Sequence, residues 1–251
     1  MVRASAGAVV VGVDGSDSSL RAVDAAVRTA AERELPLRIV HAFVWPLVRI
    51  PRGHVPVAPP AGGEEMSGGL RQEAERIVEE ARQRACAAGT GVPVEGEVVV
   101  GGPAAVLIRQ STSAVLLVLG DRGLGGFAGL LLGSVAEQVC AHAASPVMIV
   151  RGAGHAAGPV VVGVDGSATS AEALAFAADE AVRRRTDLAV LHAWAKPVVA
   201  GLTALTPLVC DVDALISAAQ QVLDRAVADL GRSHPHLTVE PQLVEGRPAG
   251  R

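Results

Sequence analysis

A long internal repeat constrains the fold of this chain more than any other feature. Residues 9–16 read Val-Val-Val-Gly-Val-Asp-Gly-Ser, and residues 160–167 carry the same residues in the same order. Further along, Glu-Val-Val-Val-Gly-Gly-Pro-Ala at 97–104 resembles Gln-Leu-Val-Glu-Gly-Arg-Pro-Ala at 242–249. Self-similarity at this distance predicts that the chain consists of two tandem copies of one structural unit.

The two copies differ in length. We expect copy one to cover residues 1–151 and copy two to cover residues 159–251, with a glycine-rich junction between them. In copy one, Pro103 is followed by a helix, a strand, a glycine-rich loop, another helix and a last strand. Copy two stops three residues after Pro248. We therefore expect copy two to lack the C-terminal portion that corresponds to these last elements of copy one, namely the helix, strand, loop, helix and strand after Pro103.

Apolar runs alternate with amphipathic stretches along copy one. We expect strands at residues 8–13, 37–43, 94–100, 115–119 and 147–150. We expect one helix capped by Ser16 or Ser18, and others at 70–88, 104–111 and 134–142. The second of these helices should turn five apolar residues inward, namely Leu70, Ala74, Ile77, Val78 and Ala81. Alternating strands and helices predict an α/β fold, with a parallel sheet and helices on both faces.

Composition narrows the class of protein further. Hydrophobic residues make up 50% of the chain and aromatic residues only 2%, so the core must consist of aliphatic side chains, which suits parallel strands. A formal net charge of −4 provides no basic field, so we expect no nucleic-acid partner. We find no uninterrupted apolar stretch that would span a membrane and no signal peptide. The cysteines form no C-x-x-C pair, which favours a reduced, cytoplasmic protein. We expect Cys140 to lie on the inner face of its helix.

A glycine-rich loop follows the strand expected at 115–119. Gly120, Gly123 and Gly133 are spaced G-x2-G-x9-G, and Ser134 opens the next helix. Glycines let the backbone approach an anion closely, so that N–H groups can surround phosphate oxygens at a helix N-terminus. The Ser134 hydroxyl and the Arg122 guanidinium can add hydrogen bonds to the phosphates. The loop therefore predicts a phosphate-binding site at the carboxyl edge of the sheet, although a simple turn is the alternative.

The loop after the first strand lies at the same edge. It contains Gly12 and Asp14, and the Asp14 carboxylate could accept hydrogen bonds from ribose hydroxyls or help to hold a metal ion. A Walker-type P-loop is excluded because no Gly-Lys-Ser/Thr follows the glycines. The match to the dinucleotide-binding fingerprint is poor as well, because its third glycine is missing after the first strand. His41 and its repeat His192 end the second strand of each copy, where we expect structural hydrogen bonds rather than catalysis.

Taken together, these motifs resemble the universal stress protein family in its tandem two-domain form. The resemblance rests on Val-Gly-Val-Asp-Gly-Ser in both copies, on the glycine loop with Ser134, and on Ser-Pro-Val-Met-Ile-Val at 145–150. It implies the open five-stranded sheet of adenine nucleotide alpha hydrolase-like domains, ATP as ligand, and pairing of domains through the last strand. Carried over to this chain, the implied ATP contacts are Gly12, Asp14, Ala42, Gly120, Asp121, Arg122, Gly123, Leu124, Gly125, Gly126, Gly133, Ser134 and Val135.

Two departures from the family pattern affect the expected site. Asp121 places a charge inside the phosphate loop, where it would repel phosphate unless its side chain points outward or meets a metal ion such as magnesium. Copy two retains Gly163 and Asp165 but has no second glycine loop. We therefore expect ATP to bind in copy one alone.

The function predicted on these grounds is that of an ATP-binding regulatory module in a stress response. Slow ATP hydrolysis is one alternative, and a dimerising structural module with a vestigial site is another. We assign no catalytic residue, because fast hydrolysis needs a positioned base and a metal site. We also expect a homo-oligomer, or poor stability of copy two, since the unpaired first strand of copy two and its exposed apolar helix faces would attract partners.

Overall fold

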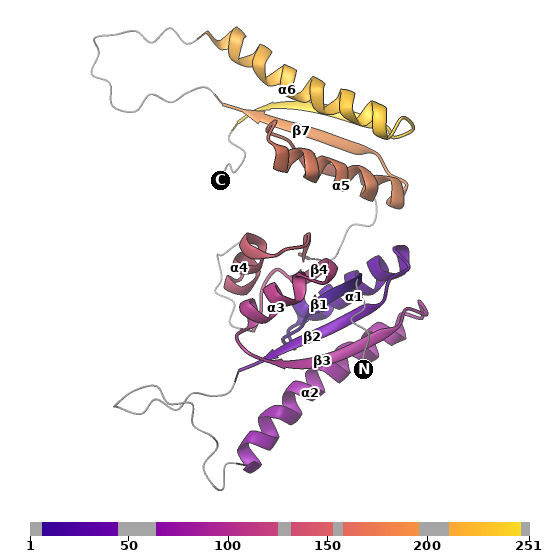
Figure 1. Ribbon diagram of the computed structural model, residues 1–251, viewed down its shortest axis with the longest axis vertical. Helices are drawn as coiled ribbons and strands as arrows, with labels where there is room; N and C mark the ends of the chain where they lie inside the picture. Colours follow the sequence, from indigo (N-terminus) through magenta and orange to yellow (C-terminus); the bar gives the residue numbers. More distant parts are fainter. Residues whose placement is uncertain (1–6, 45–63, 125–131, 153–157, 196–210, 247–251) are drawn as a thin grey trace, which may run out of the picture. The chain divides into compact units, whose positions relative to one another are not determined.

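The computed structural model describes residues 7–44, 64–124, 132–152, 158–195 and 211–246 (Figure 1). Within the chain, contacts separate two compact units, Met1–Gly154 and His155–Arg251. Each unit has its own parallel sheet, so the predicted α/β class is confirmed.

Unit one contains a five-stranded sheet. Its strands are β1 (Ala8–Gly12), β2 (Leu37–Phe43), β3 (Val94–Val100), β4 (Ala114–Gly120) and β5 (Val147–Val150). They lie in the order β3-β2-β1-β4-β5, and every neighbouring pair is parallel. The strand order reverses between β1 and β4, which is where open α/β sheets bind ligands beyond the carboxyl ends of their strands.

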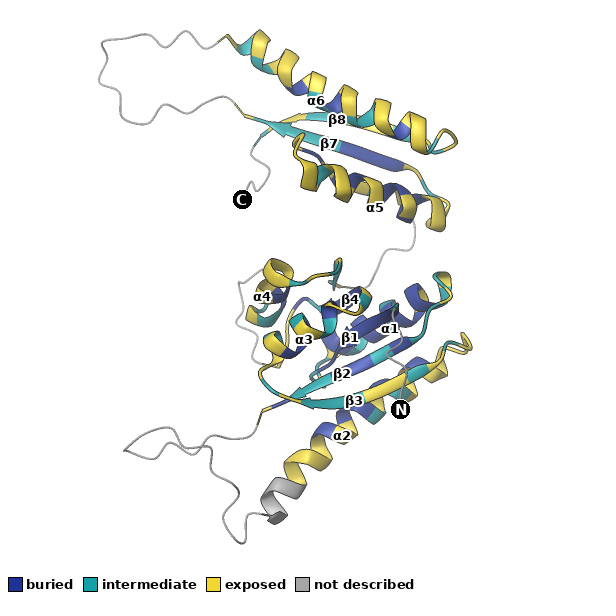
Figure 2. Ribbon diagram, viewed as in Figure 1, coloured by how far each residue is buried: buried dark blue, intermediate teal, exposed yellow. Residues whose placement is uncertain are grey.

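Helices cover both faces of this sheet. They are α1 (Asp17–Glu32), α2 (Glu64–Ala87), α3 (Pro103–Ser111) and α4 (Ser134–His142). Successive β1 residues point to opposite faces. Val9 and Val11 therefore pack in the core cluster with α1 and α2, whereas Val10 packs in the cluster with α3 and α4. The central strands are dark blue in Figure 2 because they are buried between these two layers.

Local contacts explain where α1 begins. The Ser16 side chain is the N-cap and accepts a hydrogen bond from the Ser19 amide at 3.2 Å. A hydroxyl acceptor at this position satisfies an N–H group that has no partner within the helix. Of the two serines expected as caps, Ser16 therefore has this role, and Ser18 contacts another element.

Two inward-facing side chains were predicted wrongly. Leu70 is 40% exposed, and the first buried residue of α2 among its described side chains is Ala74, one turn later. Cys140 is exposed as well. The buried stripe of the short helix α4 runs through Ala136 and Val139, and it is too narrow to include Cys140. The other four residues expected on the inner face of α2 are buried.

Unit two contains a smaller, three-stranded sheet. Its elements are β6 (Val160–Gly163), α5 (Ala168–Arg184), β7 (Leu188–Trp194), α6 (Val212–Ser233) and β8 (Val239–Glu245). The order is β6-β7-β8 with parallel pairing, so β6 is an edge strand among the described residues. Both helices share one core cluster with the three strands.

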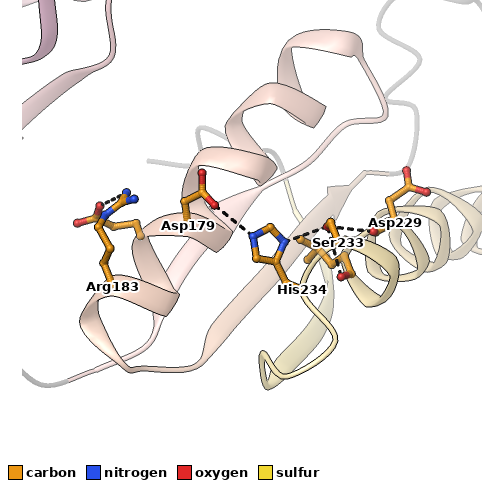
Figure 3. A network of polar contacts seen from close by, with 7 residues as sticks. Asp179, Arg183, Asp229, Ser233 and His234 are labelled. Carbon is orange, nitrogen blue, oxygen red and sulfur yellow. Dashed lines mark hydrogen bonds and ion pairs between the residues drawn. The ribbon is translucent and has the colours of Figure 1, made fainter. Parts of the chain in front are cut away.

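A polar network joins the two helices of unit two (Figure 3). His234, just after α6, places its Nε2 atom 3.2 Å from an Asp179 carboxylate oxygen on α5. Its Nδ1 atom lies 2.9 Å from the Ser233 hydroxyl oxygen, which is itself 3.2 Å from the Asp229 carbonyl oxygen. The network thus connects the C-terminal turn of α6 to α5.

The repeated histidines have the structural role expected of them. The Nδ1 atom of His41 lies 2.8 Å from the Val13 carbonyl oxygen, and that of His192 lies 2.6 Å from the Val164 carbonyl oxygen. The same contact in both copies holds the loop after the first strand against the second strand.

Candidate functional site

Unit one has a cavity of about 440 Å³ beyond the carboxyl ends of β1, β2 and β4. The N-termini of α3 and α4 border it as well. The lining residues are Gly12, Val13, Asp14, Ser19, Val40, His41, Ala42, Pro103, Leu107, Leu119, Gly120, Asp121, Arg122, Gly123, Leu124, Leu132, Gly133, Ser134, Val135 and Ala136. The cavity lies at the point where the strand order reverses.

The structure brings together the site residues that were expected from the sequence. Each of them that the structure describes lines this cavity, from Gly12 on β1 to Val135 on α4. Gly125 and Gly126 lie outside the described residues. That these residues bind a ligand remains a prediction.

Sequence reasoning missed most of the apolar wall of the cavity. Val40 in the middle of β2, Leu107 on α3 and Leu132 before α4 all line it. Their signal in the sequence is that of ordinary core residues, because apolar strand and helix positions look alike whether they face a cavity or a neighbour. Pro103 directly precedes the helix expected at 104–111 and is the first residue of α3, but its position beside the cavity follows only from the packing of α3 on the sheet.

Gly120 allows β4 to approach the first turn of α1. A β-carbon at Gly120 would lie 2.5 Å from the Ser18 hydroxyl oxygen and 2.8 Å from the Ser18 carbonyl carbon. Since main-chain atoms cannot move aside without shifting the helix, only glycine fits this position. The close approach sets where the loop after β4 begins.

Main-chain hydrogen bonds anchor both ends of the loop. The Asp121 amide donates to the Val150 carbonyl oxygen at 3.1 Å, and the Gly133 amide donates to the Asp121 carbonyl oxygen at 2.8 Å. Gly133 is the N-cap of α4, and no side chain caps the helix there. The first N–H groups of α4 therefore lack a side-chain acceptor, which is the arrangement that favours an anion at a helix N-terminus.

The Asp121 carboxylate turns away from solvent and toward α1. Its residue is only 4% exposed, and one carboxylate oxygen accepts a hydrogen bond from the Ser18 hydroxyl at 2.6 Å. Arg122 and Arg151 place their Nε atoms 3.5 Å and 3.9 Å from the other oxygen. The Ser18 hydrogen bond, aided by the Arg122 charge, lowers the pKa of Asp121.

The sequence left open whether the Asp121 side chain points outward or meets a metal ion. In the structure, the partners of its carboxylate are a hydroxyl and two guanidinium groups. No group of three or more His, Cys, Asp or Glu residues that could hold a metal ion occurs in the part of the chain that the structure describes. Nearby positive charge reduces the repulsion that this carboxylate would exert on a phosphate.

Asp14 uses both of its carboxylate oxygens. Oδ1 accepts hydrogen bonds from the Ser16 amide at 3.0 Å and from the Ser16 hydroxyl at 2.6 Å. Oδ2 accepts a hydrogen bond from the Leu124 amide at 3.0 Å, across the cavity mouth. Asp14 thus connects the loop after β1 to the glycine-rich loop after β4.

Unit two has a cavity of about 470 Å³ at the opposite edge of its sheet, next to the N-terminal ends of β7 and β8. Arg185, His234 and His236 are among its lining residues. It has no glycine-rich loop and lies between the C-terminal ends of two helices, where exposed carbonyl groups disfavour anions. The cavity of unit one therefore remains the candidate site.

Comparison with known proteins identifies the family. The sequence profile described as the universal stress protein family matches residues 7–151 and again residues 157–250. The chain belongs to the universal stress protein family. Universal stress protein Rv2623 of Mycobacterium tuberculosis is 35% identical over 252 residues, which cover 96% of this chain and 80% of that protein. The resemblance seen in the sequence is thereby confirmed.

Two solved structures from the family are also similar. A universal stress protein from Archaeoglobus fulgidus DSM 4304 superposes with a TM-score of 0.66 at 18% identity and covers 97% of this chain and 80% of its own. At this identity, the similarity supports only the assignment of the fold. A universal stress protein solved in complex with cAMP is 35% identical, has a TM-score of 0.39, and covers 57% of this chain and 95% of its own. None of the described helices of this chain is long and apolar enough to cross a membrane.

Proposed function

We propose that copy one of this universal stress protein binds ATP, and that the protein acts as a nucleotide-dependent regulatory module in a stress response. One observation carries the proposal. A single cavity combines an apolar wall from β2, β4 and α3 with a glycine-rich loop and an uncapped helix N-terminus. An adenine base needs an apolar wall of this kind, and phosphate groups need the glycine-rich loop and the helix N-terminus.

The charges around the cavity support binding of an anion. Gly133 and Ser134 present the N-terminus of α4, whose dipole favours negative charge. Arg122 borders the loop with an exposed side chain. The buried carboxylate of Asp121 is turned toward Ser18 and compensated by arginines. The phosphate end is therefore polar, and Arg122 and the N-terminus of α4 supply its positive charge without a Walker lysine.

The described residues do not fit a dedicated magnesium site. Asp14 and Asp121, the two carboxylates that line the cavity, are each engaged in hydrogen bonds to protein groups. The same engagement leaves no carboxylate positioned as a general base, which favours binding over fast hydrolysis as the role of this site.

We further propose that the protein self-associates and is cytoplasmic. The outer edge of β5 has no partner among the described strands, so it offers main-chain groups to a second copy, as the family resemblance implies. Cys86 and Cys140 are free thiols, which suits a reducing compartment. A structural module whose nucleotide site is vestigial remains the competing function.

The substitution Gly133→Val tests nucleotide binding without disturbing the fold. A β-carbon at Gly133 meets its nearest atoms at 3.5 Å or more, so the variant should fold, but its side chain fills space between loop and helix. We expect the wild type to release adenine nucleotide that mass spectrometry detects, and to show a thermal shift with ATP that Gly133→Val loses. The control is Gly163→Val in copy two, where a β-carbon meets nothing within 4 Å. The proposal fails if purified wild-type protein carries no nucleotide and shows no shift.

A further inference from the structure

Three elements hold Asp121 in place at the start of the glycine-rich loop. Its amide donates to the Val150 carbonyl oxygen of β5, and its carbonyl oxygen accepts a hydrogen bond from the amide of Gly133, the N-cap of α4. Its Oδ1 atom accepts a hydrogen bond from the Ser18 hydroxyl, in the first turn of α1, at 2.6 Å. Because both the main chain and one carboxylate oxygen are held, the direction of the second oxygen, Oδ2, is fixed as well.

Two arginines share this second oxygen. The Nε atoms of Arg122 and Arg151 lie 3.5 Å and 3.9 Å from Asp121 Oδ2. Among the described residues that line the cavity, Arg122 is the only arginine or lysine. Its contact with Asp121 uses Nε, whereas the two Nη groups carry most of the N–H donors of an arginine. A guanidinium held through Nε can therefore still offer its Nη groups to a phosphate.

The energetic value of this contact follows from the exposure of the two partners. The Arg122 side chain is 43% exposed, whereas that of Asp121 is 5% exposed. A long exposed side chain loses rotamer freedom when it binds a ligand, and an ion pair to a fixed carboxylate reduces that loss in advance. The charge of Asp121 acts in the opposite direction, because a carboxylate repels a phosphate. The effect of Asp121 on a phosphate thus depends on whether Arg122 is present.

Unit two contains a carboxylate of similar burial in a different setting. Glu180 is 6% exposed and forms ion pairs with Arg183 at 2.8 Å and with Arg184 at 2.7 Å. All three residues belong to α5, and none of them lines the cavity of either unit. This cluster stabilises a helix, whereas Asp121 holds an arginine that borders a cavity. Glu180 is therefore a matched control for the loss of a buried, arginine-paired carboxylate.

We propose that Asp121 is a positioning residue, which holds the Arg122 guanidinium at the phosphate end of the cavity so that it meets the phosphates of ATP. The inference rests on the proposed function of the cavity. Asp121 acts through Arg122 rather than by touching the ligand. Its effect should therefore appear with ATP, be absent with adenosine, and require Arg122.

The variants Asp121→Asn and Arg122→Gln, alone and together, form a double-mutant cycle that tests this role. Asparagine keeps an oxygen for Ser18 but turns an NH2 group, which cannot accept a hydrogen bond, toward the arginines. By calorimetry on the full-length protein, we expect Asp121→Asn to weaken ATP binding about fivefold and to leave adenosine binding unchanged. In the Arg122→Gln background, the same substitution should not weaken ATP binding, because it removes only a repulsive charge. The control Glu180→Gln should leave both affinities unchanged.

Circular dichroism checks that each variant is folded. If Asp121→Asn does not fold, Ser18→Ala takes its place, because it removes the hydrogen bond that fixes the carboxylate and should weaken ATP binding in the same Arg122-dependent way. An ATP affinity that falls by the same factor with and without Arg122, or that does not fall at all, would overturn the inference. An equal loss of adenosine binding would also overturn it, since such a loss indicates a general distortion of the cavity.

If wild type binds neither ligand, the proposed function fails, and the mobility of the Arg122 side chain decides the inference. Nitrogen relaxation of the Arg122 Nε–H group should show restricted motion in wild type and in Glu180→Gln, and faster, wider motion in Asp121→Asn. Equal mobility in wild type and Asp121→Asn would exclude a positioning role for this carboxylate.

Discussion

At the scale of single residues, the surroundings of a carboxylate decide its role more than its place in a motif. Asp14 and Asp121 both line the cavity, and both carry charge that a phosphate would meet. The Asp121 carboxylate is buried against Ser18 and compensated by guanidinium groups, so it anchors the loop to α1. The second oxygen of Asp14 instead accepts a loop amide at the cavity mouth.

The buried position of Asp121 predicts a dependence of stability on pH. Because its pKa is lowered in the folded state, its contribution is complete above the ordinary value of 3.8 and is lost as the pH falls through the lower, folded value. We expect Asp121→Asn to reduce the free energy of unfolding by about 1–2 kcal/mol at pH 7, since a charge-assisted hydrogen bond is replaced by a neutral one. The difference from wild type should shrink toward pH 3.

Urea denaturation followed by circular dichroism at several pH values measures this difference. Asp187→Asn is the control, because Asp187 is exposed and its loss should change stability little at any pH. A difference between wild type and Asp121→Asn that stays constant down to pH 3 would show that the charge of Asp121 does not stabilise the fold.

At the scale of elements, the two sheets differ in how their second faces are covered. Val10 of β1 and Val161 of β6 are equivalent in the repeat, yet Val10 is 0% exposed and Val161 is 62% exposed. In unit one, α3 and α4 pack over this face of the sheet. The helices of unit two share their core cluster with Val162 and Val164, on the other side of β6.

This contrast predicts losses of stability of different size for the same substitution made in the two copies. Val10→Thr should lower the free energy of unfolding by about 2 kcal/mol, because it buries a hydroxyl group among aliphatic side chains. Val161→Thr should change it by less than about 0.5 kcal/mol, since the side chain is already in contact with water. Urea titrations of both variants measure the difference. Similar losses in the two copies would show that the face of β6 is covered in solution.

At the scale of the whole molecule, the two units present strand edges to their surroundings. Among the described strands, β5 ends one sheet and β6 ends the other, and each has a neighbour on one side. Unpaired edges and exposed apolar side chains such as Val161 favour association with other chains. These are physical grounds for self-association that add to the family resemblance.

We expect light scattering to give a mass above that of the 25.5 kDa monomer. Val161→Lys should shift the distribution toward the monomer, because a charge on an edge strand disfavours pairing. The control Ile216→Lys alters an exposed apolar residue of the helix α6 rather than of a strand, and should leave the distribution unchanged. A monodisperse wild-type monomer would contradict this prediction.

The local pattern of the sequence was sufficient to predict the type and position of most helices and strands. β2, β3, β5 and α4 have the bounds that periodicity and turn residues predicted. Errors occurred where a helix has a narrower or shorter buried stripe than its apolar residues suggest, at Leu70 and Cys140. Periodicity reports which residues share a helix face, but only packing decides how much of that face is covered.

The sequence by itself determined the repeat, the α/β class, the family and the glycine-rich loop, because these depend on residue order and short-range spacing. Only the tertiary structure decided what the two carboxylates do. Asp121 accepts a hydrogen bond from Ser18, which is 103 positions away in the chain, and Asp14 accepts one from the Leu124 amide, which is 110 positions away. Such contacts arise when parallel strands bring distant loops to one sheet edge, and no local pattern encodes which side chain then meets which amide.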